Sequence, residues 1–263
     1  MSASPKWDDL APRLASGAVM VVIGLLGVWL GGIWWHLLIA AISGVMVWEL
    51  AVMLHGANSD RMLMLGGIAA AAAMLSIELP AGFALPLLLA PALVGVTLLG
   101  RRAPTYMIYT AVILLAGYGM MALRDDFGLV WMLWLVLVVI VTDVGGYFAG
   151  RMIGGPKFWP RVSPKKTWSG TVAGWICAGF IGAIFAGFTE AGSELVGISI
   201  AAAMASQMGD VAESAIKRRC GVKDSSRLIP GHGGLLDRFD GMLGAALFLL
   251  VVGQIVNFPP GVQ

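Results

Sequence analysis

Apolar residues form nine long stretches in this chain, and short connectors between them carry most of the polar residues. The stretches cover residues 15–32, 33–54, 62–77, 83–99, 105–123, 129–150, 171–188, 195–218 and 240–256. Each is close to the length of about 17–25 residues that an α-helix needs to cross a bilayer. Because lipid cannot satisfy open backbone groups, the pattern predicts an all-α, polytopic integral membrane protein with about nine transmembrane helices. Pro86 and Pro91 predict a kink in the fourth helix.

Composition agrees with a membrane protein. Of the 263 residues, 59% are hydrophobic and 12% are charged, whereas a soluble domain carries about 25% charged residues. The first stretch follows Asp8, Asp9 and Arg13, which do not form the positively charged segment that precedes the apolar core of a signal peptide. It also has no convincing cleavage site, so we interpret it as a retained helix. The two cysteines, Cys177 and Cys220, match neither a disulfide framework nor a metal-ligand spacing.

Connector charges predict the orientation of these helices. With the N-terminus in the cytoplasm, the N-terminal tail and the even-numbered connectors hold 16 of the 17 Lys and Arg residues, and only Arg124 falls on the other side. The positive-inside rule therefore predicts nine spans, a cytoplasmic N-terminus and a periplasmic or external C-terminus. We expect one membrane-embedded domain over residues 1–263, placed in the inner (cytoplasmic) membrane. Polar chemistry is concentrated in residues 141–263, while residues 1–140 are mostly scaffold helices.

The segment 214–240 is the most polar part of the chain. It contains six basic residues: Lys217, Arg218, Arg219, Lys223, Arg227 and Arg238. Gly231, Gly233 and Gly234 surround His232, and such glycines let backbone N–H groups approach a phosphate. The segment therefore predicts a phosphate-binding loop at the cytoplasmic face. The simpler alternative is a polybasic surface attracted to anionic lipid. His232 alone is more often structural than a ligand, and we do not assign it as a general base.

Acidic residues inside the predicted helices favour a site over a simple basic surface. A carboxylate at membrane depth costs about 2.5–3.5 kcal/mol and normally has a partner or a function. Helical spacing places polar residues on one face of each of three helices. These faces comprise Ser206, Gln207, Asp210, Glu213, Ser214 and Lys217; Asp143, Gly146, Tyr147, Gly150 and Arg151; and Asp237, Asp240, Gly241 and Gly244.

We expect the three faces to meet in one cavity on the cytoplasmic side. Asp210 and Asp237 are the candidate ligands of a divalent cation, because Mg²⁺ takes one or two carboxylates, waters and substrate phosphates. The alternative is that the carboxylates only neutralise nearby Lys and Arg residues. For Asp224 and Asp240 the two interpretations have about equal weight.

Twelve positions of the polar segment follow a fixed pattern, and two upstream motifs precede it. The twelve are Ser214, Lys217, Arg218, Lys223, Asp224, Pro230, His232, Gly233, Gly234, Asp237, Arg238 and Asp240, and the motifs are DVGGYFAGR at 143–151 and SPKKT at 163–167. In these residues the chain resembles the phosphatidate cytidylyltransferases, also called CDP-diacylglycerol synthases. The resemblance is strong from Asp143 onward and weak before it. One departure is Ser169, where members of that family commonly have Glu.

The resemblance implies a nucleotidyltransferase that makes CDP-diacylglycerol and pyrophosphate from CTP and phosphatidate, with Mg²⁺, or Mn²⁺ as a substitute, as cofactor. It implies Asp210 and Asp237 as metal ligands, with Asp143 and Asp240 as secondary candidates. The implied catalytic residues are Asp210, Asp237, Lys223, Asp224, Arg238 and Asp240. The implied substrate-phosphate contacts are Ser163, Lys165, Lys166, Ser214, Lys217, Arg218, His232, Gly233 and Gly234. We expect no nucleic-acid partner, and the small-residue helix faces permit a homodimer in the bilayer.

Three alternatives make different predictions. A CDP-alcohol phosphotransferase needs D-G-x-x-A-R followed by aspartates separated by three residues, whereas two residues separate Asp237 from Asp240. An anion or proton-coupled transporter predicts polar residues through the full membrane depth. A lipid-binding scaffold would explain the basic loops but not Asp210.

Overall fold

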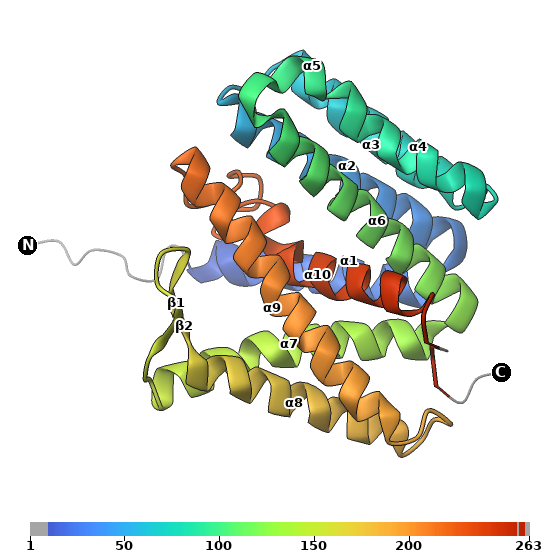
Figure 1. Ribbon diagram of the computed structural model, residues 1–263, viewed down its shortest axis with the longest axis vertical. Helices are drawn as coiled ribbons and strands as arrows, with labels where there is room; N and C mark the ends of the chain where they lie inside the picture. Colours follow the sequence, from blue (N-terminus) through green and yellow to red (C-terminus); the bar gives the residue numbers. More distant parts are fainter. Residues whose placement is uncertain (1–9, 257, 261–263) are drawn as a thin grey trace, which may run out of the picture.

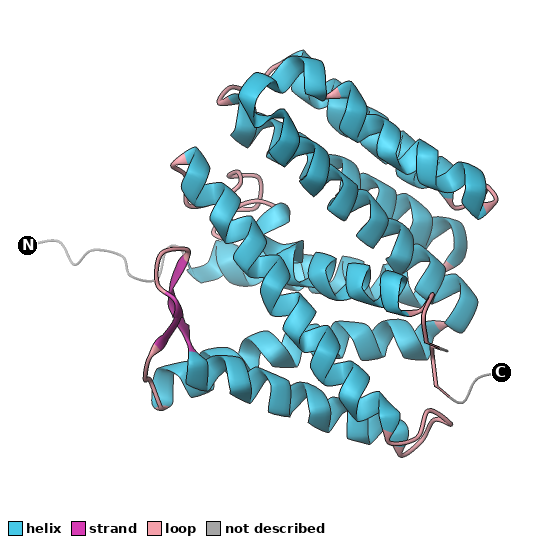
Figure 2. Cartoon of the chain, in the orientation of Figure 1, coloured by secondary structure: helices cyan, strands magenta, loops and turns pink. Residues whose placement is uncertain are grey.

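The computed structural model describes residues 10–256 and 258–260, and the described chain is mostly helical (Figures 1 and 2). The N-terminal tail 1–9, whose charges enter the orientation argument, lies outside the described residues. The helices are α1 (Leu10–Leu30), α2 (Gly32–His55), α3 (Asp60–Ser76), α4 (Ala81–Val94), α5 (Val96–Leu99), the 3-10 helix η1 (Gly100–Arg102), α6 (Ala103–Phe127), α7 (Leu129–Met152), α8 (Trp168–Ala186), α9 (Glu194–Cys220) and α10 (Leu236–Val252).

Helices form wherever an apolar stretch was predicted, so the helical architecture is confirmed. Within the described residues, five segments are both long and apolar enough to cross a membrane. These are Gly32–His55, Gly82–Phe127, Leu129–Met152, Trp168–Ala186 and Glu194–Cys220. The chain is therefore a helical protein with membrane-spanning segments, and the full count of nine spans stays a prediction.

The fourth stretch is interrupted rather than only kinked. The helix α4 contains Pro86 and Pro91 and ends at Val94, and the single turn α5 follows Gly95. The ring of Tyr106 packs against Gly95 so closely that a Cβ atom there would clash with it. The hydroxyl of Tyr106 donates a hydrogen bond to the Pro91 carbonyl oxygen at 3.3 Å. Proline lacks a backbone N–H donor, which weakens the helix here. The Tyr106 hydroxyl adds a second donor to the Pro91 carbonyl oxygen, which also accepts from the Gly95 N–H.

A short β-hairpin stands in the connector between α7 and α8, and the hydrophobic pattern did not predict it. The strands β1 (Lys157–Trp159) and β2 (Ser163–Thr167) are antiparallel. The rings of Phe158 and Trp168 pack edge to face with centroids 4.8 Å apart. The Thr167 hydroxyl then accepts a hydrogen bond from the Gly170 N–H and caps α8. The hairpin thus fixes the SPKKT residues at the start of α8.

The helices pack as two groups with α10 between them (Figure 1). The helices α2, α3, α4 and α6 pack together, and α7, α8 and α9 form the second group. The helix α10 packs against both α6 and α9 and so joins the two groups. Large side chains such as Leu50, Tyr106, Ile113 and Trp134 fill the interior and are fully buried.

Connectors separate onto two sides of the molecule. The loop after α2, the helix η1, the hairpin and the loop between α9 and α10 lie on the left in Figure 1. The turns between α1 and α2, α3 and α4, α6 and α7, and α8 and α9 lie on the right, as does the C-terminal end. The left side carries the basic connectors, as the charge pattern predicts. Which side faces the cytoplasm stays a prediction.

Candidate active site

The loop 221–235 between α9 and α10 is organised first by Asp237, in the first turn of α10. One carboxylate oxygen of Asp237, Oδ2, accepts hydrogen bonds from the Ser225 N–H, the Ser225 hydroxyl and the Gly234 N–H at 2.8, 2.9 and 2.8 Å. The other oxygen, Oδ1, lies 2.6 Å from the Lys217 ammonium. Oδ2 is therefore fully used by three donors, and Oδ1 is paired with Lys217.

A second carboxylate, that of Glu49 on α2, is fully buried and also forms hydrogen bonds with this loop and the start of α10. Its Oε1 atom accepts from the Ser226 hydroxyl at 2.6 Å and the Leu235 N–H at 3.0 Å. Its Oε2 atom accepts from the Leu236 N–H at 2.8 Å. These backbone donors belong to the start of α10, where a negative charge is favourable. Glu49 therefore connects α2 to the loop 221–235, called the charged loop below. Glu49 is not among the site residues predicted from the sequence.

Glycines are required where these carboxylates meet the backbone. Gly233 has φ +85°, and a Cβ atom there would lie 2.7 Å from Asp237 Oδ2. A Cβ atom on Gly234 would clash with the Ser225 hydroxyl and with Glu49. The His-Gly-Gly motif is thus explained by packing around Asp237 and Glu49. A direct contact of these glycines with phosphate stays a prediction.

A buried ion pair extends this network along α9. The Lys217 ammonium pairs with Glu213 one turn earlier as well as with Asp237. Glu213 is fully buried, and Lys217 is buried with it. A lone charge in such a place would cost several kcal/mol, so each member requires the others. The predicted phosphate contact of Lys217 would have to compete with two carboxylates.

The other part of the site is a cavity of about 450 Å³ between α7, β2, α8 and α9. Asp210 lines it and pairs with Lys166 of the hairpin. The Ser214 hydroxyl donates to Asp210 Oδ1 at 3.2 Å. Asp143 and Lys165 also line the cavity. The structure therefore brings together residues that the sequence assigned to one site from three separate segments.

Close packing of α7 against α8 shapes one wall of this cavity. A Cβ atom on Gly170 would clash with the Gly146 carbonyl oxygen, and one on Gly150 would lie 2.8 Å from the Thr167 hydroxyl. Gln207 of α9 joins the same wall, accepting from Trp175 Nε1 at 2.9 Å and donating to the Thr171 carbonyl at 3.2 Å. The glycines of the DVGGYFAGR motif are thus needed for helix contact.

Three aspartates approach one another at this cavity. Asp143 and Asp240 both lie near enough to Asp210 for their charges to interact. Asp240 accepts a hydrogen bond from the Gly241 N–H at 2.8 Å. Repulsion among the three would be reduced by a cation. In the described part of the chain, no group of three or more His, Cys, Asp or Glu side chains has the arrangement of a preformed metal site.

Several predicted phosphate contacts and catalytic residues lie outside this cavity. Lys223, Asp224, Arg218 and Arg238 are exposed, and Ser163 is half-buried in β2. Lys223 and Asp224 belong to the loop 221–235, and Arg218 and Arg238 donate to its Val222 and His232 carbonyl oxygens.

His232 has structural contacts. Its Nδ1 atom shares a hydrogen bond of 2.8 Å with the Ser16 hydroxyl of α1. Its carbonyl oxygen accepts from Arg238 Nε at 3.1 Å. These contacts connect α1 to the loop.

Ser169 has a local partner in place of the carboxylate expected at this position. Its hydroxyl donates to the Gly154 carbonyl oxygen and shares a hydrogen bond of 3.0 Å with Thr167. The residue therefore closes the hairpin onto the start of α8 instead of adding charge to the cavity.

Comparison with known proteins identifies related sequences. The family model described as "Cytidylyltransferase family" matches residues 11–256. A phosphatidate cytidylyltransferase of Brucella suis is 45% identical over 141 residues, which cover 52% of each chain. The protein of the same name from Staphylococcus saprophyticus is 46% identical over 132 residues, covering 48% of this chain and 51% of that protein. The chain thus aligns over about half the length of the curated relatives it matches.

Proposed function

The chain belongs to the cytidylyltransferase family, and from this membership and the charged cavity we propose that it is a phosphatidate cytidylyltransferase. The reaction would convert CTP and phosphatidate to CDP-diacylglycerol and pyrophosphate. The observation that carries the proposal is the meeting of Asp210, Lys166 and the helix α7 carboxylate Asp143 in one cavity. Three segments far apart in sequence supply these groups.

The chemistry requires charge control more than a strong protein base. An oxygen of the lipid phosphate attacks the α-phosphorus of CTP, and the bond from that phosphorus to the β-phosphate bridging oxygen breaks. The attacking phosphomonoester has a second pKa of about 6 and is already ionised near neutral pH. The site must align two polyanions and stabilise the leaving pyrophosphate.

Basic residues at the cavity would perform this alignment. Lys165 and Lys166 line it directly. Lys223 lies in the loop 221–235, and Arg218 and Arg238 contact that loop. We propose that Lys166 exchanges its contact with Asp210 for a phosphate oxygen when the substrates bind. Lys217 keeps Asp237 and the loop in place, because its ammonium already lies between two carboxylates.

The donor set fits one magnesium ion with few protein ligands. We propose Asp210 as its principal ligand, because the carboxylate lines the cavity and faces Asp143 and Asp240. Asp237, the other predicted ligand, already has Lys217 at Oδ1 and three donors at Oδ2, so a cation would compete with these partners. When bound, the ion would supply positive charge to the phosphates, as Mg²⁺ or Mn²⁺ does with one or two carboxylates and waters.

We further propose nine spans in the inner membrane, with the site facing the cytoplasm. The separation of basic connectors onto one side supports this orientation under the positive-inside rule. The cavity would then lie at the level of the cytoplasmic head groups, where phosphatidate can enter sideways while its acyl chains stay in the bilayer. Exposed apolar side chains such as Val144 and Phe148 on α7 fit contact with lipid.

The direct test measures product formation by the purified full chain with phosphatidate, Mg²⁺ and CTP. We expect CDP-diacylglycerol, and we expect Asp210→Asn to abolish it while the protein remains folded. Glu194→Gln, an exposed carboxylate at the other end of α9, is the matched control and should retain full activity. A folded wild-type protein that makes no CDP-diacylglycerol would refute the proposed function.

A further inference from the structure

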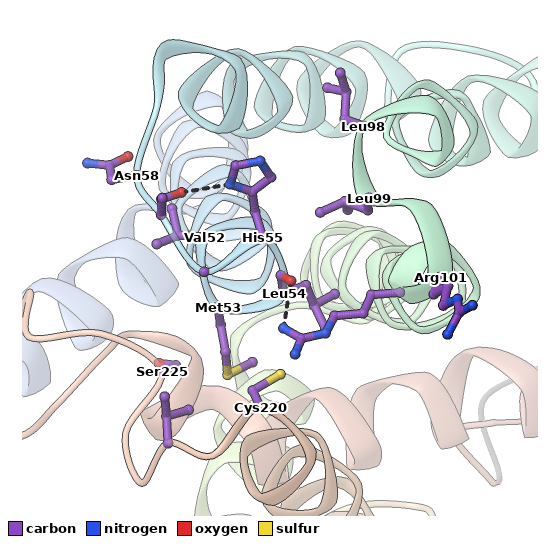
Figure 3. A pocket seen from close by; sticks show the side chains of 14 residues that line it. Val52, Met53, Leu54, His55, Asn58, Leu98, Leu99, Arg101, Cys220 and Ser225 are labelled. Carbon is purple, nitrogen blue, oxygen red and sulfur yellow. Dashed lines mark hydrogen bonds between the residues drawn. The ribbon is translucent and has the colours of Figure 1, made fainter.

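A second cavity lies next to the charged loop, and the proposed reaction does not use it. Its volume is about 780 Å³. It is lined by the end of α2 and the loop after it, by α5 and η1, and by Cys220, Val222 and Ser225 at and after the end of α9 (Figure 3). None of the described residues lines both this cavity and the one at Asp210. It is therefore a separate space on the same side of the molecule.

Cationic and hydrogen-bonding groups line this cavity without any carboxylate. Arg101 and Arg102 come from η1, His55 is the last residue of α2, and Asn58 comes from the loop after it. Arg102 Nη1 donates to the Leu54 carbonyl oxygen at 2.8 Å, which holds its guanidinium at the end of α2. Among the described residues, no Asp or Glu lines the cavity. Cationic side chains that meet no acidic residue in the lining make an anion favourable in this cavity.

The rest of the lining is apolar. Val52, Met53, Leu98 and Leu99 contribute to the same cavity, and Figure 3 shows Leu98 and Leu99 on the wall opposite Val52 and Met53. A general basic surface attracts lipid through scattered exposed charges. Here the charged residues line a concave space that also has an apolar wall. That combination suits a ligand with an anionic head, and it accommodates an apolar part beside it.

We propose that this cavity binds a phosphate-bearing anion. Arg101 and Arg102 would contact the phosphate, since guanidinium groups match phosphate oxygens in geometry and remain charged. Asn58 and His55 would add hydrogen bonds from the facing wall. The phosphate could belong to a phospholipid head group or to a soluble compound such as pyrophosphate. The recognised chemistry is the same in both cases.

An occupant would touch the organised loop through Ser225. This residue lines the cavity, and its N–H and hydroxyl are the two donors that it gives to Asp237. Cys220, at the end of α9, lines the same cavity and is half-buried. A bound anion would therefore cover Cys220 and leave Cys177, which lies in α8, unaffected.

The test uses Cys220 as a natural reporter in the full chain, held in phosphatidylcholine nanodiscs. The rate at which N-ethylmaleimide alkylates Cys220 is followed by peptide mass spectrometry during titration with pyrophosphate or, separately, with increasing phosphatidylglycerol in the disc. Saturable protection of Cys220 is expected with at least one of the two probes, and Cys177 provides the internal reference. Protection by phosphatidylglycerol alone assigns the site to head groups, and protection by pyrophosphate alone assigns it to soluble phosphates.

The variant Arg101→Gln separates a site from general attraction. Arg101 is exposed and lines the cavity, and its loss should raise the midpoint of protection about tenfold, which corresponds to about 1.4 kcal/mol. Arg61→Gln removes the same charge from an exposed position at the start of α3, outside the cavity lining, and should leave the midpoint nearly unchanged. An equal shift in both variants, or no protection by either probe, would overturn the proposal.

Discussion

Glu49→Gln tests whether one buried carboxylate on α2 keeps the charged loop closed. The substitution preserves the shape of the side chain but replaces one acceptor oxygen by an NH₂ group. The carboxylate accepts hydrogen bonds from the Leu235 and Leu236 N–H groups at 3.0 and 2.8 Å. In either orientation of the amide, its NH₂ group would face one of these two N–H donors. The site therefore loses its charge and at least one backbone hydrogen bond.

The expected cost follows from these contacts. A hydrogen bond to a charged group contributes about 1.5–3 kcal/mol, and a negative charge at a helix N-terminus adds about 0.3–1 kcal/mol. Together they give about 3 kcal/mol for opening the loop, which corresponds to an increase of about 100-fold in the open population. Lys223 and Arg227, both exposed on the loop, are the trypsin sites that report this opening.

The assay is limited proteolysis of the full chain in detergent, with cleavage after Lys223 and Arg227 followed by mass spectrometry. Cleavage follows the open population when opening and closing are fast compared with proteolysis. We expect about 100-fold faster cleavage in Glu49→Gln, as worked out above. The control Glu194→Gln should behave as the wild type. Cleavage of Glu49→Gln at the rate of Glu194→Gln would refute the role of Glu49.

Three further predictions concern the cavity at Asp210. Gly170→Ala should destabilise the fold by about 1–3 kcal/mol, because its Cβ would clash with the Gly146 carbonyl. Thermal unfolding measures this change. The control Gly197→Ala should not destabilise the fold, because its Cβ would meet open space. Lys166→Met should lower kcat/KM about 10- to 100-fold through loss of a charged phosphate contact. Lys157→Met, an exposed lysine in the same hairpin, should have little effect, and equal losses in both lysine variants would contradict the contact. Removal of divalent ions by EDTA should stop turnover and added Mg²⁺ should restore it; turnover that persists in excess EDTA would exclude the proposed metal.

The hydrophobic pattern predicts the helices well because the length of an apolar stretch is a strong local signal. This signal is weaker at the polar ends of the helices. The helix α10 begins at Leu236, ahead of the predicted start at 240, because Glu49 satisfies the N–H groups of Leu235 and Leu236. That stabilisation comes from a residue on another helix. No local pattern contains it.

The hairpin was missed for a related reason. Its strands are short and contain Pro164 and two adjacent lysines, so neither alternation nor β-propensity is visible. The hairpin depends on contacts with the start of α8, including the packing of Phe158 against Trp168.

Within the site, polar spacing predicted the position of Asp210 at a cavity. Its role as a metal ligand stays a prediction. The recurrence of polar residues along α9 correctly placed Ser214 beside Asp210. The spacing does not reveal that Asp237 already contacts Lys217, Ser225 and Gly234. The role of Asp237 as a metal ligand also stays a prediction.

Glu49 gave one visible signal, a single carboxylate inside the apolar stretch 33–54. A charge at such depth normally has a partner or a function. Its partners lie far along the chain, at Ser226, Leu235 and Leu236. Only the folded arrangement identifies them.

The fate of the CTP phosphates tests the central claim most directly. The purified full chain is given phosphatidate, Mg²⁺ and CTP labelled at either the α- or the γ-phosphate. If the lipid phosphate attacks the α-phosphorus, the α-label appears in the lipid product and the γ-label appears in pyrophosphate. Transfer of the γ-label to lipid, or no labelled lipid from a folded protein, would contradict the account.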